Sequence, residues 1–201
     1  MEIVYRRGRI EDCLKIAEGI ERASGGIVDF LFHDLLKNST PAETMAGFLR
    51  DGVGYESYEN AIVAECQETI VGIVYSYPSK YHEITEETKN FFPKERLEFL
   101  ADFFSSRVEN SLFLDSIYVD EEFRGQGVGS KLIALTKEKA KESGYQQLSL
   151  MVMNENITAR RAYERSRFKI VKHVDVKEHE LIPNKGGIYL LVSDVDKENL
   201  I

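Results

Sequence analysis

Residues 111–133 read SLFLDSIYVDEEFRGQGVGSKLI, and this stretch decides the fold. Residues 111–120 carry the strongest strand pattern in the chain. Residues 130–144 space their apolar side chains as an amphipathic helix does, and Gly144 ends that helix. A strand that enters a helix through a glycine-rich turn is typical of α/β proteins.

The glycine-rich turn consists of Arg124, Gly125, Gln126, Gly127, Val128 and Gly129. The first N–H groups of a helix have no partner within it, and the helix dipole adds about half a positive charge there. Glycine lets a ligand approach the backbone closely, so the turn suits a phosphate-bearing ligand such as a pyrophosphate. A simpler explanation is that the glycines only supply the positive φ angles of the turn. The turn lacks the spacing of a dinucleotide fold and the GK[ST] ending of a P-loop.

Before this stretch, the pattern predicts a strand, three helices and a hairpin. The first helix is expected to bury one stripe, formed by Ile10, Cys13, Leu14, Ala17 and Ile20. Thr40 is expected to cap the third helix, which begins at Pro41. The strand is expected at 2–7, the helices at 9–24, 27–37 and 41–50, and the hairpin strands at 61–66 and 69–77.

Residues 78–93 read as irregular, and 93–107 as a helix inserted between two strands. After the turn and its helix, a strand is expected at 146–153, a helix at 156–167, and two closing strands at 168–177 and 186–195. Strands that alternate with helices, with hairpins at both ends, predict a mixed α/β sheet.

Composition narrows the functional classes. The net charge of −8 disfavours nucleic acid and anionic membrane as partners, and no apolar stretch is long enough to span a bilayer. The N-terminus shows no secretory or transit signal, so we expect a cytoplasmic protein. Two distant cysteines are expected to be reduced, and four scattered histidines predict no metal site. His33 and His82 are expected on the surface, although both lie in segments that would border an acceptor pocket.

Two motifs resemble those of the GCN5-related N-acetyltransferases (GNAT). LDSIYVDEEFRGQGVGSKLI resembles their acyl-CoA-binding motif, Gln/Arg-x-x-Gly-x-Gly/Ala, at Arg124, Gly127 and Gly129. NITARRAYERSRF resembles their second motif, and the positions that match are Asn156, Ala159, Tyr163 and Phe168. The family has a glycine where this chain has Arg167, which suggests a different exit from the helix.

The resemblance implies the GNAT fold, an acyl-CoA N-acyltransferase fold in one domain of residues 1–201, with a mixed sheet of about seven strands flanked by helices. In this chain we also expect a helical insertion between the third and fourth strands. The resemblance further implies direct transfer of an acetyl group from acetyl-CoA, as cosubstrate, to a primary amine of a small molecule or peptide, without metal. Asn156 and Ala159 join the turn in the set expected to hold the cofactor. The backbone of Ile117, Tyr118 and Val119 is expected to pair with pantetheine and to stabilise the oxyanion.

The resemblance implies Tyr163 as the acid for the departing thiolate, although a tyrosine on a helix face also packs structurally. Some relatives use a glutamate as base where this chain has Met151. Asp115 lies four residues before Val119, hence on the same strand face, and is our candidate base, equally open to a structural role.

Two other functional classes stay open. Met151 favours a catalytically weak acyl-CoA-binding sensor or scaffold, and a nucleotide-binding α/β domain is the second alternative. The phenylalanines of the insertion suggest either a cover over the site or the surface of a homodimer.

Overall fold

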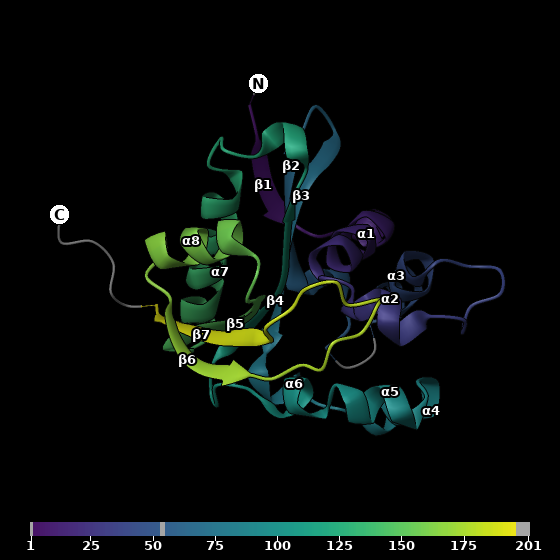
Figure 1. The fold of residues 1–201 in the computed structure, drawn as a ribbon. Coiled ribbons are helices and arrows are strands. Elements are labelled where there is room, and N and C mark those ends of the chain that lie inside the picture. The colour runs from purple at the N-terminus through teal and green to yellow at the C-terminus, as the bar shows by residue number, and fades with distance from the viewer. Residues whose placement is uncertain (1, 53–54, 196–201) are drawn as a thin grey trace.

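The computed structural model describes residues 2–52 and 55–195, which form a seven-stranded sheet between helices (Figure 1). The strand order is β1-β2-β3-β4-β5-β7-β6. β4 and β5 run parallel and every other neighbouring pair runs antiparallel, which confirms the predicted mixed sheet. The strands are β1 (Val4–Arg7), β2 (Ala61–Cys66), β3 (Thr69–Pro78), β4 (Leu112–Val119), β5 (Gln147–Met153), β6 (Lys169–Val174) and β7 (Ile188–Asp194).

The helices cover both faces of this sheet. α7 and α8 lie on one face, and α1, α2 and α3 lie on the other side of the central strands (Figure 1). The helices are α1 (Cys13–Ala23), α2 (Ile27–Phe32), α3 (Pro41–Asp51), α4 (Glu86–Phe91), α5 (Lys94–Phe99), α6 (Ala101–Ser105), α7 (Val128–Glu142) and α8 (Ile157–Arg165).

Two apolar cores lie on the two faces of the sheet. In the first, the α7 core, Leu132 of α7 is fully buried with Leu114 of β4. In the second, the α1 core, Ile16 of α1 is fully buried with Phe113 of β4. Each such side chain contributes about 1.5–3 kcal/mol by leaving water. Neighbouring residues of β4 thus face opposite cores, as the two-residue period of a strand requires.

The cysteines lie in different cores. Cys13 packs in the α1 core and Cys66 in the α7 core, and both thiols are free. Because the sheet separates them, they cannot form a disulfide with each other.

The predicted hairpin is confirmed, with Gln67 and Glu68 as its two-residue turn. Both residues have positive φ, 49° and 61°, as a type I′ turn requires. The cap on α3 is also confirmed, since Glu43 N–H donates to Thr40 Oγ1 at 3.1 Å.

The predicted stripe on the first helix is wrong at its N-terminal end. Ile10 and Leu14 are 50% and 42% exposed, whereas the buried face carries Cys13, Ile16 and Ala17. Residues 10–12 form a separate 3₁₀ turn, η1 (Ile10–Asp12), so Ile10 does not follow the phase of α1. Leu14 lies about 100° around the helix from the buried Cys13, beside the buried face. The phase of the helix is therefore set from Cys13 onward.

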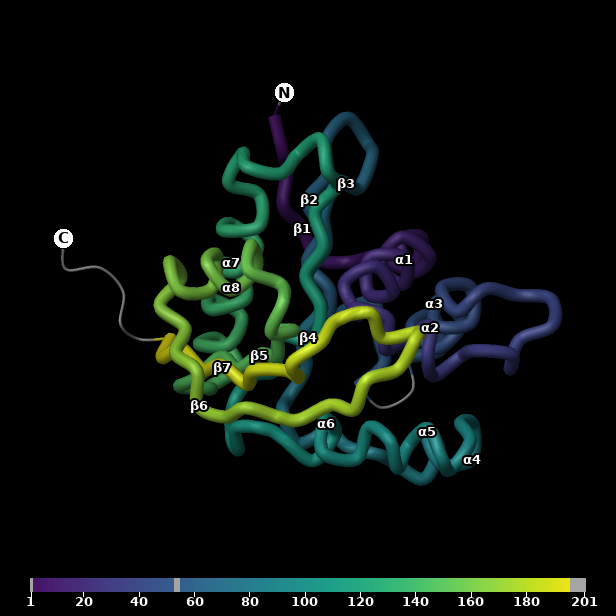
Figure 2. Tube along the Cα trace, in the orientation of Figure 1, coloured from purple at the N-terminus to yellow at the C-terminus, as the bar shows by residue number. Residues whose placement is uncertain are grey.

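The insertion between β3 and β4 also differs from its prediction. Instead of one helix at 93–107 it contains α5 and α6, and the stretch expected to be irregular contains α4. The insertion packs against α2 and the segment between β6 and β7 (Figure 2). Phe30 of α2 contacts Phe99 of α5, with ring centroids 4.9 Å apart. The phenylalanines of the insertion thus contribute to a third apolar cluster within the chain.

Candidate functional site

The parallel strands β4 and β5 diverge after a short paired stretch. Only Leu112–Leu114 of β4 pair with Leu148–Leu150 of β5, although β4 continues to Val119 and β5 to Met153. From Asp115 onward, the edge of β4 that faces β5 has no strand partner among the described residues. Backbone N–H and C=O groups on such an edge can pair with an extended ligand as an added strand does.

A β-bulge marks the start of this divergence. Tyr75 of β3 pairs with Ser116, but the next residue, Ser76, pairs with Leu114, so Asp115 is the extra residue. Asp115 therefore bonds with Tyr77 in the α1 core, whereas Val119 packs in the α7 core. The prediction that Asp115 and Val119 share a strand face is wrong, because the bulge shifts the alternation by one residue.

Two side-chain hydroxyls hold the Asp115 carboxylate. Tyr77 Oη donates to Oδ1 and Ser116 Oγ donates to Oδ2, each at 2.8 Å. Burial raises the pKa of Asp115, and the two hydrogen bonds oppose that rise only in part. The carboxyl group therefore binds a proton more readily than an exposed aspartate does.

The glycine-rich turn forms the start of α7. Gly125 and Gly127 have φ of 74° and 86°, which L side chains rarely adopt. No heavy atom lies within 4 Å of a Cβ built at either position, so the space above the turn is open. The first helical hydrogen bond runs from Lys131 N–H to Gly127 O at 3.0 Å, which leaves the preceding N–H groups of the first turn without helical partners.

Two polar side chains brace the turn from below. Arg124 Nε donates to Val119 O at 2.9 Å, and its guanidinium also approaches Glu121. Gln126 Nε2 donates to Glu122 O at 2.7 Å. Val128 is buried beneath the turn, whereas Gly129 is half-buried beside Val119. The turn is therefore fixed to the end of β4, with Gly125 and Gly127 toward solvent.

Tyr163 of α8 lies in the α7 core and is 6% exposed. Burial raises its pKa, so the phenol keeps its proton at neutral pH. Among the described residues, none forms a hydrogen bond with the Tyr163 hydroxyl. That hydroxyl is thus available to a ligand, although a packing role alone would also bury the ring.

The end of α8 corrects the expectation for Arg167. Arg167 has φ of 65°, the left-handed conformation that glycine usually supplies at a helix end. Arg167 N–H donates to Glu164 O and Phe168 N–H donates to Tyr163 O, at 2.9 and 3.0 Å, which is a Schellman motif. The helix therefore exits through a left-handed residue even though that residue is not glycine.

Asn156 begins α8 as its cap, and its Oδ1 accepts from Ala159 N–H at 3.1 Å. Its side-chain oxygen thus serves the helix, which leaves the amide nitrogen for a ligand. Asp115 and Tyr163, the two predicted catalytic residues, belong to the α1 core and the α7 core, on opposite sides of the sheet. The unpaired part of β4 lies at the boundary between these cores.

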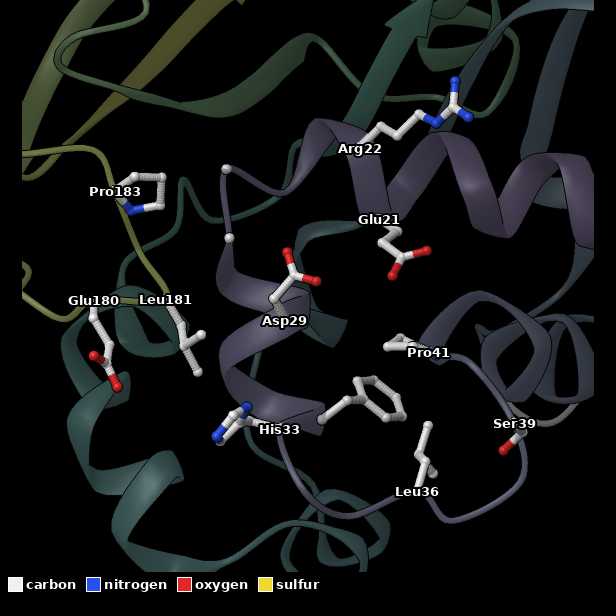
Figure 3. Close-up of a pocket in the computed structure, with 13 residues that line it drawn as sticks. Glu21, Arg22, Asp29, His33, Leu36, Ser39, Pro41, Glu180, Leu181 and Pro183 are labelled. Atoms are coloured by element: carbon white, nitrogen blue, oxygen red, sulfur yellow. The ribbon is translucent and has the colours of Figure 1, made fainter.

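A cleft of about 910 Å³ opens on the α1 side of the sheet (Figure 3). Its walls come from α1, α2, the segment that leads to α3, and the segment between β6 and β7. The charged residues that line it are Glu21, Arg22, Asp29, His33 and Glu180. Sequence reasoning missed these carboxylates, because no motif links Glu180 to Glu21 and Asp29, which lie about 150 residues before it in the chain.

The carboxylates of Glu21 and Asp29 are directed toward the same space in the cleft, whereas Arg22 points away from it (Figure 3). Burial and the nearby Asp29 raise the pKa of Glu21. Arg22 donates instead to Tyr118 Oη at 2.9 Å. Within residues 2–52 and 55–195, neither Glu21 nor Asp29 has a recorded ion pair, so the cleft favours a cation.

The two histidines singled out in the sequence have different environments. His33 is half exposed at the cleft and lies 3.1 Å from Asp34. His82 is only 2% exposed, so its expected surface position is wrong. The insertion covers it, and its ring lies between Phe103 and Phe113, with centroids 4.9 and 4.3 Å away.

The described residues contain no group of three or more His, Cys, Asp or Glu side chains that would hold a metal ion. No helix in the same part of the chain has both the length and the apolar character needed to cross a bilayer.

Comparisons with known proteins agree with this geometry. The model of the acetyltransferase (GNAT) family matches residues 31–168. Thialysine N-epsilon-acetyltransferase of Bos taurus is 43% identical over 54 residues, which are 27% of this chain. The aligned stretch spans 32% of the bovine protein, about a third of its length.

Solved structures resemble nearly the whole chain. The crystal structure of an acetyltransferase aligns with a TM-score of 0.69 at 26% identity, over 96% of this chain and 100% of that one. An N-acetyltransferase from Staphylococcus aureus Mu50 aligns with a TM-score of 0.71 at 15% identity, over 94% and 100%. At that identity the second likeness concerns the fold alone.

Proposed function

The chain belongs to the acetyltransferase (GNAT) family, and we propose that it moves an acetyl group from acetyl-CoA to a primary amine of a small cationic molecule. The observation that carries this proposal is the unpaired part of β4 beside the open turn at the start of α7. A peptide amine remains the second acceptor class.

The turn and the edge of β4 suit the two ends of this cosubstrate. The free N–H groups of Gly125 to Gly129 would hold the pyrophosphate at the positive end of α7. The edge from Ile117 to Val119 would pair with the amides of the pantetheine arm and donate to the oxyanion. When bound, acetyl-CoA supplies a thioester that is activated for attack by an amine. Open space above Gly125 and Gly127 is the observation that favours this fit.

Tyr163 would protonate the departing thiolate. Its raised pKa keeps the phenol protonated, which is the state a general acid needs. A phenol with a pKa above 10 still gives its proton to a thiolate slowly unless the two atoms are held together. Its fixed position in the core supplies that constraint.

Asp115 would remove the proton that an alkylammonium must lose before attack. Its raised pKa makes it a stronger base than an exposed carboxylate, and Tyr77 and Ser116 hold it in place. A water molecule can carry the proton over any gap between the amine and the carboxylate.

The acidic cleft is our candidate for the acceptor site. Glu21 and Asp29 would bind a second positive charge on the acceptor, because neither carboxylate has an ion pair among the described residues. Thialysine N-epsilon-acetyltransferase of Bos taurus is named for a small amine acceptor, which supports the same class here. The volume of the cleft also suits a small molecule.

The alternative function is an acyl-CoA-binding sensor with little turnover. Met151 favours it, since a thioether cannot accept the proton at that position. Asp115 is the feature against it, because the chain then has another carboxylate within the same core as Met151.

Calorimetric titration with CoA, NAD and ATP tests the cofactor, and consumption of acetyl-CoA tests turnover. We expect tight binding of CoA alone. We also expect consumption with polyamines or basic amino acids in a panel that includes aminoglycosides and short peptides. Binding of CoA without consumption of acetyl-CoA across the panel would favour the sensor over the transferase. Tight binding of NAD or ATP would contradict both functions.

A further inference from the structure

The half-buried Asp115 and the buried Tyr77 and His82 form a hydrogen-bonded row from β4 into the insertion. Asp115 Oδ1 accepts from Tyr77 Oη at 2.8 Å, and that same hydroxyl lies 3.4 Å from His82 Nδ1. Tyr77 and His82 are 5% and 2% exposed, so both side chains are shielded from water. The family motifs explain neither of these two residues.

The tautomer of His82 follows from its second nitrogen. Nε2 lies 3.1 Å from the backbone oxygen of Phe103, and a carbonyl oxygen can only accept. Burial lowers the pKa of His82 to about 4, so the ring is neutral and carries a single N–H. That hydrogen must be on Nε2, which leaves a lone pair on Nδ1 facing Tyr77.

The hydroxyl of Tyr77 has one proton and two acceptors. While Asp115 is ionised, the proton points to Asp115 and the Nδ1 lone pair of His82 has no donor in this row. When Asp115 gains a proton, its O–H can donate to Tyr77 Oη, and the Tyr77 proton is then free to turn to His82 Nδ1. The protonated state thus satisfies one more buried acceptor than the ionised state does.

We propose that Tyr77 and His82 are positioning residues that hold Asp115 ready to accept a proton. The proposal rests on the function proposed above, in which Asp115 takes a proton from the acceptor ammonium. That proton stays on Asp115, while two O–H bonds rotate and neither Tyr77 nor His82 changes its charge. The row therefore stabilises the proton on Asp115 without moving it farther.

Other groups face this row from each neighbouring element. Ser116 donates to Asp115 at all stages, and Tyr55 and Tyr75 lie beside Tyr77 with centroids 4.7 and 5.9 Å away. Arg107 acts on His82 from farther away, and Glu56, Glu83 and Glu87 act on the neighbouring Tyr55. Because the positions of these groups are the same in both states of the Tyr77 hydroxyl, they do not create the coupling between Asp115 and His82.

Nuclear magnetic resonance tests the row without any turnover. In the full-length protein with ¹⁵N-labelled histidine and ¹³C-labelled aspartate, we expect an Nε2–H tautomer for His82. Its Nδ1 signal should shift with the same midpoint as the Asp115 carboxyl, while the ring stays neutral. Tyr77→Phe should abolish the Nδ1 step. An Nδ1–H tautomer, or an Nδ1 signal that does not change as Asp115 titrates, would overturn the proposal.

Kinetics then test the consequence for the reaction. His82→Phe removes the acceptor, so protonated Asp115 loses its extra hydrogen bond and the basic form persists to lower pH. We expect the acidic limb of the kcat profile to move down by roughly one pH unit, with KM little changed. His82→Asn, whose Oδ1 replaces Nδ1, should restore the profile.

Tyr75→Phe is the matched control, since Tyr75 Oη bonds to Tyr55 O and not to Asp115. Equal shifts in Tyr75→Phe and His82→Phe would overturn the proposal in favour of a general packing effect. If the protein has no transferase activity, the resonance experiment still shows whether protonation of Asp115 is coupled to His82 through Tyr77. Failure of the proposed function is therefore distinguishable from failure of this inference.

Discussion

The rings of Tyr163 and Phe168 pack edge to face with centroids 5.6 Å apart, across the left-handed residue that ends α8. In a Schellman motif, the residue after the left-handed position contacts the third residue from the helix end. Here that structural contact involves the proposed general acid. The motif that ends the helix therefore also holds the Tyr163 ring in place.

Tyr163→Phe keeps this ring contact and removes only the hydroxyl. We expect the fold and the affinity for acetyl-CoA to stay unchanged while kcat falls by about 10²-fold or more, because the thiolate then departs without an acid. Steady-state kinetics with calorimetry on the same sample measure both quantities. Tyr145→Phe, on another aromatic residue of the α7 core, is the control. Unaltered turnover in Tyr163→Phe would remove the residue from the mechanism.

The Arg167→Gly variant should be more stable than the Arg167→Ala variant. A residue with a Cβ is strained at φ of 65°, so glycine should raise the free energy of unfolding by roughly 0.5–1 kcal/mol relative to Arg167→Ala. The comparison with alanine removes the side chain of Arg167 from both variants and isolates the backbone. Gly144→Ala at the equivalent position of α7, φ 81°, should lower stability by a similar amount. Urea denaturation of the three variants measures these differences in the free energy of unfolding. Equal stabilities of the two Arg167 variants would contradict backbone strain at this position.

Patterns within one segment were enough to predict most elements of the fold. The hairpin around Gln67 and the cap at Thr40 follow from neighbouring residues, and both are confirmed. The turn from Arg124 to Gly129 lies at the start of a helix as predicted, because glycine spacing and helix periodicity are both local signals.

Features that depend on tertiary contacts were not predictable. The bulge at Asp115 arises from pairing with β3, and the sequence of β4 alone shows an uninterrupted strand. His82 reads as a surface histidine until the insertion folds over it. Glu180 lines the same cleft as Glu21 and Asp29 because the segment between β6 and β7 reaches α2.

Gly127→Val should abolish binding of CoA. A branched side chain would occupy the open space above the turn and would block close approach of a pyrophosphate to the backbone. The backbone strain at φ of 86° also destabilises the fold, so a control with equal strain is needed. Gly52→Val provides it, since Gly52 has φ of 65° and open space around it at the end of α3. Calorimetry should show binding only in Gly52→Val, and unchanged affinity in both variants would refute binding of the pyrophosphate at the glycine-rich turn.

Stability should rise with pH in alkaline solution because of Lys139. Its Nζ donates to Asn60 O and Ser76 O at 3.0 and 2.9 Å, and burial lowers its pKa to about 8. Above pH 8 the native state loses this proton before the unfolded state does, so unfolding becomes less favourable until about pH 10.5. The gain is at most about 3 kcal/mol.

Comparison with Lys139→Met isolates this contribution, since tyrosines and cysteines titrate in the same range. The stability of the wild type relative to the variant should increase from pH 8 to 10. Lys131→Met, at an exposed position on α7, should show no such trend. A wild-type advantage that is flat or falling with pH would mean that Lys139 stays charged in the folded protein.

Glu21→Gln and Asp29→Asn should weaken binding of the amine acceptor and leave the affinity for acetyl-CoA unchanged. Each removes one carboxylate from a cleft where no ion pair compensates it among the described residues, so KM for a diamine should rise roughly 10-fold. KM for a monoamine of the same length should change much less, because it has no second charge for these groups to bind. Glu18→Gln, one turn away on α1 and paired with Lys15, is the control. Equal effects on diamine and monoamine would place the distal charge of the acceptor elsewhere, since loss of packing does not distinguish the two substrates.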